Sequence, residues 1–82
     1  MVTPLDTLLR TVGLSAREVF ARGGPPPMSL WRWKQGVEAR PATIRRLAVT
    51  VGQPFDVVAL AVLQTVADAR KRAAPRDERA MA

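Results

Sequence analysis

The residue types that most often carry out catalysis are scarce in this sequence of 82 residues. It contains no histidine and no cysteine, which excludes imidazole bases, thiol nucleophiles and the usual zinc ligand sets. The remaining candidate nucleophiles are Ser15 and Ser29, and the scattered carboxylates show no nucleophile–base spacing with either serine. We therefore expect a binding protein rather than an enzyme, with no cofactor and no metal.

Residues 25–36 combine side chains that are suited to binding. Their sequence, PPPMSLWRWKQG, places a methionine and two tryptophans in a basic setting behind three prolines. Because proline is tolerated only in the first turn of a helix, we expect a short helix to begin near Pro27. One face at helical spacing holds Leu30, Trp33 and Val37, which we expect to face the core. The opposite face presents Met28, Trp31, Arg32 and Gln35.

The charge balance favours an anionic partner. The sequence has 13 basic and 7 acidic residues, a net charge of +6, which points to nucleic acid first and a membrane surface second. Arginine supplies 11 of the 13 basic residues, and a genome-wide bias toward arginine is the alternative explanation. No stretch approaches the roughly 18 apolar residues of a membrane span, and the N-terminus lacks a signal-peptide pattern. We therefore expect a cytoplasmic protein without membrane association.

Two short helices are predicted before the proline-rich segment. Thr3–Asp6 holds a capping hydroxyl, a first-turn proline and an acid, and Ser15–Glu18 is a capping box, so each stretch predicts a helix start. Glycines follow both apolar patterns and end the helices. We expect Val19 and Phe20, in the second of these helices, to point inward.

Two helices are also predicted after this segment. The first begins near Pro41 and ends at Gly52, and the second runs from about residue 54 to residue 72. The basic cluster at 70–72 closes the last helix, where cations complement the helix dipole; a second contact with DNA is the alternative. Residues 73–82 lack periodicity, so we expect a flexible tail.

The last helix is apolar almost all round. A terminal helix of so small a domain cannot bury every face against its own chain, so we expect its outer stripe to form a homodimer interface. The alternative is that it only covers its own core. The residues assigned to the dimer interface are Phe55, Val58, Val62, Leu63 and Val66.

Residues 15–36, SAREVFARGGPPPMSLWRWKQG, resemble a helix-turn-helix motif, with two helices separated by a glycine turn. The apolar, glycine, apolar and apolar slots of the motif hold Val19, Gly24, Leu30 and Trp33. Over about residues 5–60 the sequence resembles the phage-repressor and Cro-like family, also called Xre-like. The resemblance implies an all-α fold, a compact four- to five-helix repressor-like domain over residues 1–72 with an extended C-terminal helix.

The resemblance also implies which residues would contact DNA. Arg32 occupies the later base-reading position of the family and is suited to bidentate hydrogen bonds with guanine. The full set of expected base contacts is Pro27, Met28, Ser29, Trp31 and Arg32. The expected phosphate contacts are Arg17, Lys34, Gln35, Arg40, Arg45 and Arg46.

Departures from the family pattern leave a second function open. The motif usually has a small residue where this chain has Phe20, and it has polar base-reading residues where this chain has Ala16, Pro27 and Met28. We therefore expect a sequence-specific regulator that binds double-stranded DNA as a dimer and represses by occupying its operator. The alternative is a protein-interaction module, or an antitoxin-like adaptor, that uses the surface of Met28 and Trp31 on the same fold.

Overall fold

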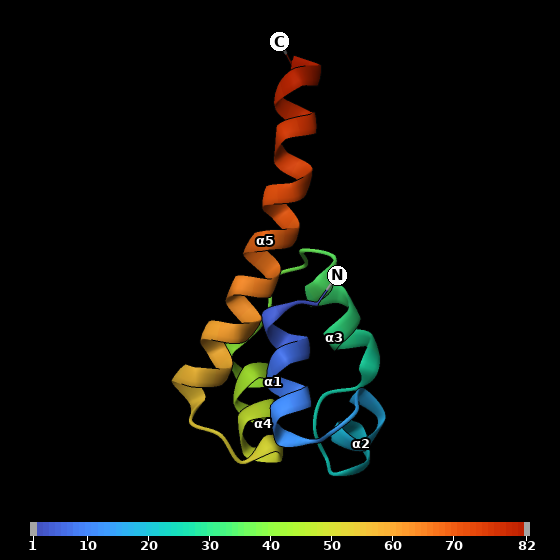
Figure 1. The fold of residues 1–82 in the computed structure, drawn as a ribbon, viewed down its shortest axis with the longest axis vertical. Helices are drawn as coiled ribbons and strands as arrows, with labels where there is room; N and C mark the ends of the chain where they lie inside the picture. The colour runs from blue at the N-terminus through green and yellow to red at the C-terminus, as the bar shows by residue number, and fades with distance from the viewer. Residues whose placement is uncertain (1, 82) are drawn as a thin grey trace.

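The computed structural model describes the backbone of residues 2–81 and the side chains of residues 2–72. All regular elements in this part of the chain are helices, which confirms the predicted all-α fold of four to five helices (Figure 1). The helices are α1 (Pro4–Val12), α2 (Ala16–Ala21), α3 (Pro27–Lys34), α4 (Pro41–Val51) and α5 (Phe55–Met81).

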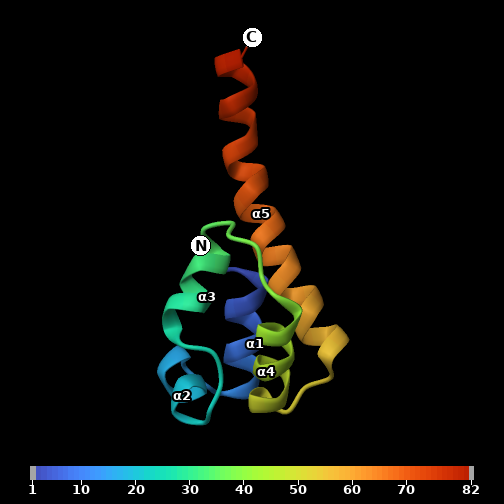
Figure 2. The same cartoon turned by 180° about the vertical axis from the view of Figure 1, so that it is seen from behind.

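The long helix α5 supports the other helices. Helices α1, α3 and α4 all contact α5, and α2 is held through its contacts with α3 and α4. Seen from both sides, the C-terminal half of α5 extends beyond the four shorter helices (Figures 1 and 2). Helices α2 and α3 lie on the opposite side of the domain from the start of α5 (Figure 1).

Local signals fix both ends of α1 and the start of α2 as the sequence predicts. The hydroxyls of Thr3 and Ser15 accept hydrogen bonds from the N–H groups of Asp6 and Glu18, which completes a capping box at the start of α1 and of α2. Gly13 ends α1 in the left-handed conformation, at φ 73°, which glycine adopts without a steric penalty. Ser15 therefore has the structural role that its spacing predicts.

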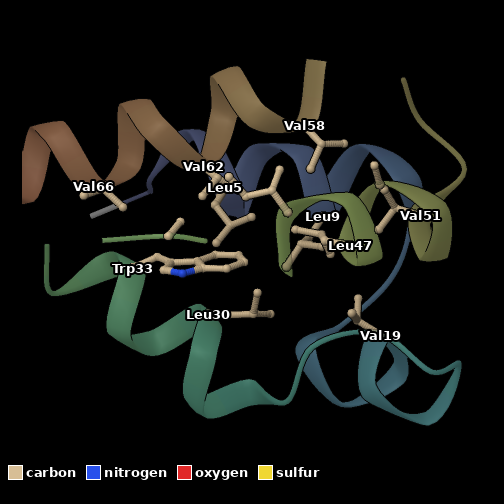
Figure 3. Close-up of a cluster of buried hydrophobic side chains, with 13 residues drawn as sticks. Leu5, Leu9, Val19, Leu30, Trp33, Leu47, Val51, Val58, Val62 and Val66 are labelled. Atoms are coloured by element: carbon tan, nitrogen blue, oxygen red, sulfur yellow. The ribbon is translucent and has the colours of Figure 1, made fainter. Parts of the chain in front are cut away.

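A single apolar core joins all five helices. Figure 3 shows Trp33 and Leu30 reaching from α3 toward Leu5 and Leu9 of α1 and toward the valines of α5. The exposed fractions of Leu30 and Trp33 are 2% and 3%, so their predicted core positions are confirmed. Helix α3 is therefore seated on the core through one face.

Three of the five residues predicted for a dimer interface are instead part of this core. Val58 and Val62 have no exposed surface, and Val66 is 5% exposed. Their spacing of four residues places them on the face of α5 that packs against the other helices (Figure 3). The prediction is therefore wrong for these valines, whereas Phe55 and Leu63 remain exposed at 40% and 52%.

Two other residues predicted to face the core are exposed. Phe20 is 56% exposed, because α2 is only six residues long and buries Val19 alone. Val37 is 48% exposed, because α3 ends at Lys34 and the chain then turns at Gly36, where φ is 90°. Helical spacing therefore failed where the helix was too short to bury a full stripe or had already ended.

Helix α5 continues past its predicted end. Its backbone remains helical through Met81, so the boundary at Arg72 is wrong; alanine, arginine and glutamate favour a helix even without an apolar stripe. The side chains of the predicted tail, residues 73–82, lie outside the described residues. Because no helix ends at 70–72, the dipole does not explain this basic cluster, and the Arg70 Nε–H donates to the Gly36 carbonyl at 2.8 Å.

A buried hydrogen bond joins α1 to α5. The Leu5 N–H donates to the hydroxyl of Thr65 at 3.1 Å, and this hydroxyl donates to the Ala61 carbonyl at 2.8 Å. Thr65 is 1% exposed, and the Leu5 N–H belongs to the first turn of α1, where backbone donors have no partner within the helix. Thr65 therefore supplies an acceptor that the helix itself cannot.

Replacing Thr65 by valine tests this hydrogen bond. Both side chains are β-branched and have similar helix propensities, so Thr65→Val mainly leaves the buried Leu5 N–H without an acceptor. We expect a loss of about 1–3 kcal/mol in the free energy of unfolding, measured by chemical denaturation. The matched control is Thr11→Val on the exposed surface of α1, which should change stability by less than about 0.5 kcal/mol. Equal effects of the two substitutions would contradict the role given to Thr65.

Candidate nucleic-acid interface

Helix α3 presents an exposed ridge that the core holds in place. Burial of Leu30 and Trp33 on one side leaves the opposite side of this eight-residue helix in solvent. Met28 and Trp31 are each 56% exposed. The complete ridge consists of Met28, Trp31, Arg32 and Gln35, as the sequence predicts.

The turn before α3 is fixed by a close approach at Gly24. A Cβ atom at this position would lie 2.6 Å from Val19 Cγ1, 2.9 Å from the Val19 carbonyl oxygen and 3.0 Å from Thr50 Oγ1. Only glycine allows this contact between α2, the turn and α4. Pro25 is buried next to it, and the ring of Pro26 sets the extended conformation that precedes α3. The proline run therefore holds the entry to α3 in one conformation.

Polar contacts hold the other end of α3. Lys34, in the last turn, forms an ion pair with Asp6 at the start of α1. Beyond the helix, the Gly36 carbonyl accepts the hydrogen bond from Arg70 of α5. Both ends of α3 are thus attached to other helices, so the ridge has a defined orientation.

The environment of Asp6 favours its charged form. Burial raises the pKa of Asp6, but hydrogen bonds from Lys34 and from the backbone and hydroxyl of Thr3 outweigh it and hold the pKa below the ordinary value. Because the pKa is lowered in the folded state, this contribution to stability is present above pH 3.8 and is lost as the pH falls through the lowered value. The attachment of α3 to α1 through Asp6 therefore weakens in acid.

Three residues predicted to contact DNA lie around one hollow beside the ridge. This hollow, which we call the arginine hollow, has a volume of about 370 Å³ and lies between α3, the loop after it and the start of α4. Ser29 and Arg32 come from α3, and Arg40 precedes α4. The remaining lining residues are Trp33, Val37, Glu38 and Thr43.

A second hollow is apolar. Pro27, Met28 and Trp31 surround a volume of about 330 Å³ on the ridge, and none of the three contributes a charge. The predicted base-contacting residues are thus divided between two surfaces of α3. One surface offers hydrogen bonds from arginine and serine, and the other offers apolar contact.

Two predicted phosphate contacts are engaged elsewhere. Lys34 is paired with Asp6, and the Arg45 guanidinium lies 5.6 Å from the centre of the Phe55 ring, at cation–π distance. The contact with Phe55 directs Arg45 toward the start of α5 rather than toward the arginine hollow. These two side chains therefore stabilise contacts between helices, and the structure does not bring them to the site.

The other predicted phosphate contacts, Arg17, Gln35 and Arg46, are exposed and do not line the arginine hollow. Sequence reasoning missed Glu38 and Thr43, which do line it. In the sequence, Glu38 stands out only as the single acidic residue between Lys34 and Arg46. For Thr43 the signal was its place in the first turn after Pro41.

Comparisons with known proteins identified no relative of this chain. No family model, no curated protein and no solved structure matches the chain. In the part of the chain that the structure describes, no acidic cluster has the three or more ligands that a metal ion would need. Nor is any helix in that part long and apolar enough to cross a bilayer.

Removing the Lys34 ammonium tests the attachment of α3 to α1. In Lys34→Met the Thr3 hydrogen bonds remain, but the principal interaction that lowers the Asp6 pKa is lost, so we expect this pKa to rise. The measurement is an NMR titration of the Asp6 carboxyl carbon. Arg46→Met, which removes an equal charge from an exposed side chain of α4, should leave the titration unchanged. An unchanged Asp6 pKa in Lys34→Met would show that the ion pair does not form in solution.

Proposed function

We propose that this protein is a cytoplasmic repressor that binds double-stranded DNA through α3. It would block transcription by occupying a specific DNA sequence. The observation that carries the proposal is the convergence of Ser29, Arg32 and Arg40 on one hollow beside an exposed helix. Arginine is the side chain best suited to bidentate recognition of guanine, and arginine also binds phosphate. The order of α2, the glycine turn and α3 supports membership of the Xre-like helix-turn-helix family.

In this proposal α3 lies in the major groove and the arginines around it contact the backbone. Arg32 would read a base from the ridge, while Arg40 and the exposed Arg17 and Arg46 would contact phosphates. The first turn of α4 contains no acidic residue and its N-cap makes no side-chain hydrogen bond, which suits a phosphate nearby. The net charge of +6 supports the same partner.

We also propose a homodimer that forms through the side of α5 facing away from the core. Val57, Leu60 and Leu63 are 45%, 59% and 52% exposed, and they lie on the side of α5 that its core valines leave free. A dimer would present two copies of α3 to half-sites about one turn of DNA apart. A small domain gains specificity in this way because two half-sites are read together.

Selection from a random duplex pool tests DNA binding directly. We expect a roughly palindromic site to be enriched, and its affinity to fall about 10³- to 10⁵-fold between about 50 and 200 mM salt if six to ten phosphates are contacted. Absence of any enriched sequence, with binding lost at physiological salt, would mean that the basic charge does not serve DNA recognition.

Arg32→Ala tests the base contact. We expect it to cost about 1–3 kcal/mol of binding free energy on the selected duplex and little on random DNA. Arg46→Ala is the matched control, since loss of a phosphate contact should weaken binding to both duplexes about equally. Equal losses on both duplexes in Arg32→Ala would remove Arg32 as a base reader.

Leu60→Asp tests the dimer. A carboxylate in the centre of a buried apolar interface lacks a partner, so we expect the variant to sediment as a monomer at concentrations where the wild type is dimeric. Val49→Asp is the control, because Val49 is 78% exposed on α4 and lies outside the proposed interface. A wild-type protein that is monomeric at all concentrations would exclude this dimer.

The apolar hollow favours a second candidate function. Pro27, Met28 and Trp31 form an exposed apolar surface, and aromatic residues often anchor protein interfaces. An interaction module or antitoxin-like adaptor would bind a protein there, and Trp31→Ala would abolish the complex with little dependence on salt. If Trp31→Ala weakened only DNA binding, this candidate would be excluded.

A further inference from the structure

The arginine hollow contains an acidic side chain that the proposed function does not explain. Glu38 lines it together with Arg32 and Arg40. Among the described side chains, none of these three takes part in an ion pair or a hydrogen bond. Two cationic donors and one anionic acceptor therefore remain available to a ligand in the same hollow.

The loop holds Glu38 in a defined place. The Val37 N–H donates to the Arg32 carbonyl at 3.0 Å, and Ala39, on the other side of Glu38, is 7% exposed within the core. The bond from Arg70 to the Gly36 carbonyl fixes the start of the same loop. The Glu38 backbone is thus anchored on both sides while its side chain remains exposed.

A phosphate group does not complement this set of charges. Phosphate offers only acceptors, so it can bind the arginines but is repelled by the Glu38 carboxylate. The major-groove edge of a G·C pair offers both kinds of group: guanine O6 and N7 accept, and the cytosine N4 amino group donates. An arginine side chain can donate to guanine O6 and N7, and a glutamate carboxylate can accept from the cytosine amino group.

We infer that Glu38 is a specificity-determining residue, which disfavours phosphate beside Arg32 in the arginine hollow and, with Arg32, selects a G·C base pair. This inference rests on the proposed DNA-binding function. In this arrangement Arg32 donates to guanine, Glu38 accepts from cytosine, and Arg40 contacts the neighbouring backbone. Removal of the Glu38 charge therefore strengthens unspecific binding and weakens discrimination between base pairs.

Glu38→Gln tests the inference, because it keeps the size of the side chain and removes its charge. We would compare binding to the selected duplex, to versions with each G·C pair replaced, and to random DNA. We expect Glu38→Gln to bind random DNA about 3- to 10-fold more tightly at low salt, and its discrimination at one G·C position to fall at least about fivefold. Asp68→Asn, which removes an exposed acid from α5, is the control and should change neither quantity.

Two other results would overturn the inference, and a third would overturn the proposed function. If Glu38→Gln binds every duplex as the wild type does, Glu38 does not face DNA and the inference is wrong. If it tightens binding to selected and random duplexes equally, Glu38 repels DNA in general and does not select a base pair, which also overturns the inference. If the wild type binds no duplex at any salt concentration, the proposed function itself fails.

Discussion

The seating of an eight-residue helix on the core through two side chains is the constraint on which the rest of the structure depends. A helix as short as α3 is not stable alone in water, so its position must come from tertiary contacts. Leu30 and Trp33 bury one face and thereby decide which residues point outward. The close approach at Gly24 fixes where the helix begins, and contacts from α1 and α5 fix where it ends. The exposed ridge therefore has a defined orientation, although α3 buries only two residues in the core.

Five of the basic residues fall into two groups with different roles. Lys34, Arg45 and Arg70 hold helices together through a carboxylate, an aromatic ring and a backbone carbonyl. Arg32 and Arg40 leave their guanidinium groups in the arginine hollow, where the described residues do not neutralise them with an ion pair. Net charge alone does not distinguish these groups. The distinction matters for function, because Arg32 and Arg40, unlike Lys34, Arg45 and Arg70, can meet an anionic partner without breaking a contact of the fold.

Local signals in the sequence were sufficient for most of the fold, and tertiary effects account for what was missed. Caps and prolines predict the starts of α1 to α4 and the apolar pattern predicts that of α5, and the core positions of Leu30 and Trp33 follow from helical spacing. Periodicity could not tell which face of the almost uniformly apolar α5 would pack inward, so core valines such as Val58 were assigned to a dimer. The partner of Arg45 could not be predicted because Phe55 is distant in sequence, and Glu38 was overlooked because its importance comes from the arginines that the fold places beside it.

In the proposed function the ridge of α3 and the arginine hollow together form the surface that meets DNA. The most direct measurement is a backbone amide NMR spectrum of the full chain, recorded at low salt during addition of a random-sequence duplex. We expect progressive shifts concentrated at residues 28–43 and weaker at Arg17 and Arg46, all reversed by added salt. Shifts confined to other surfaces, or an unchanged spectrum at saturating duplex, would contradict the proposed function.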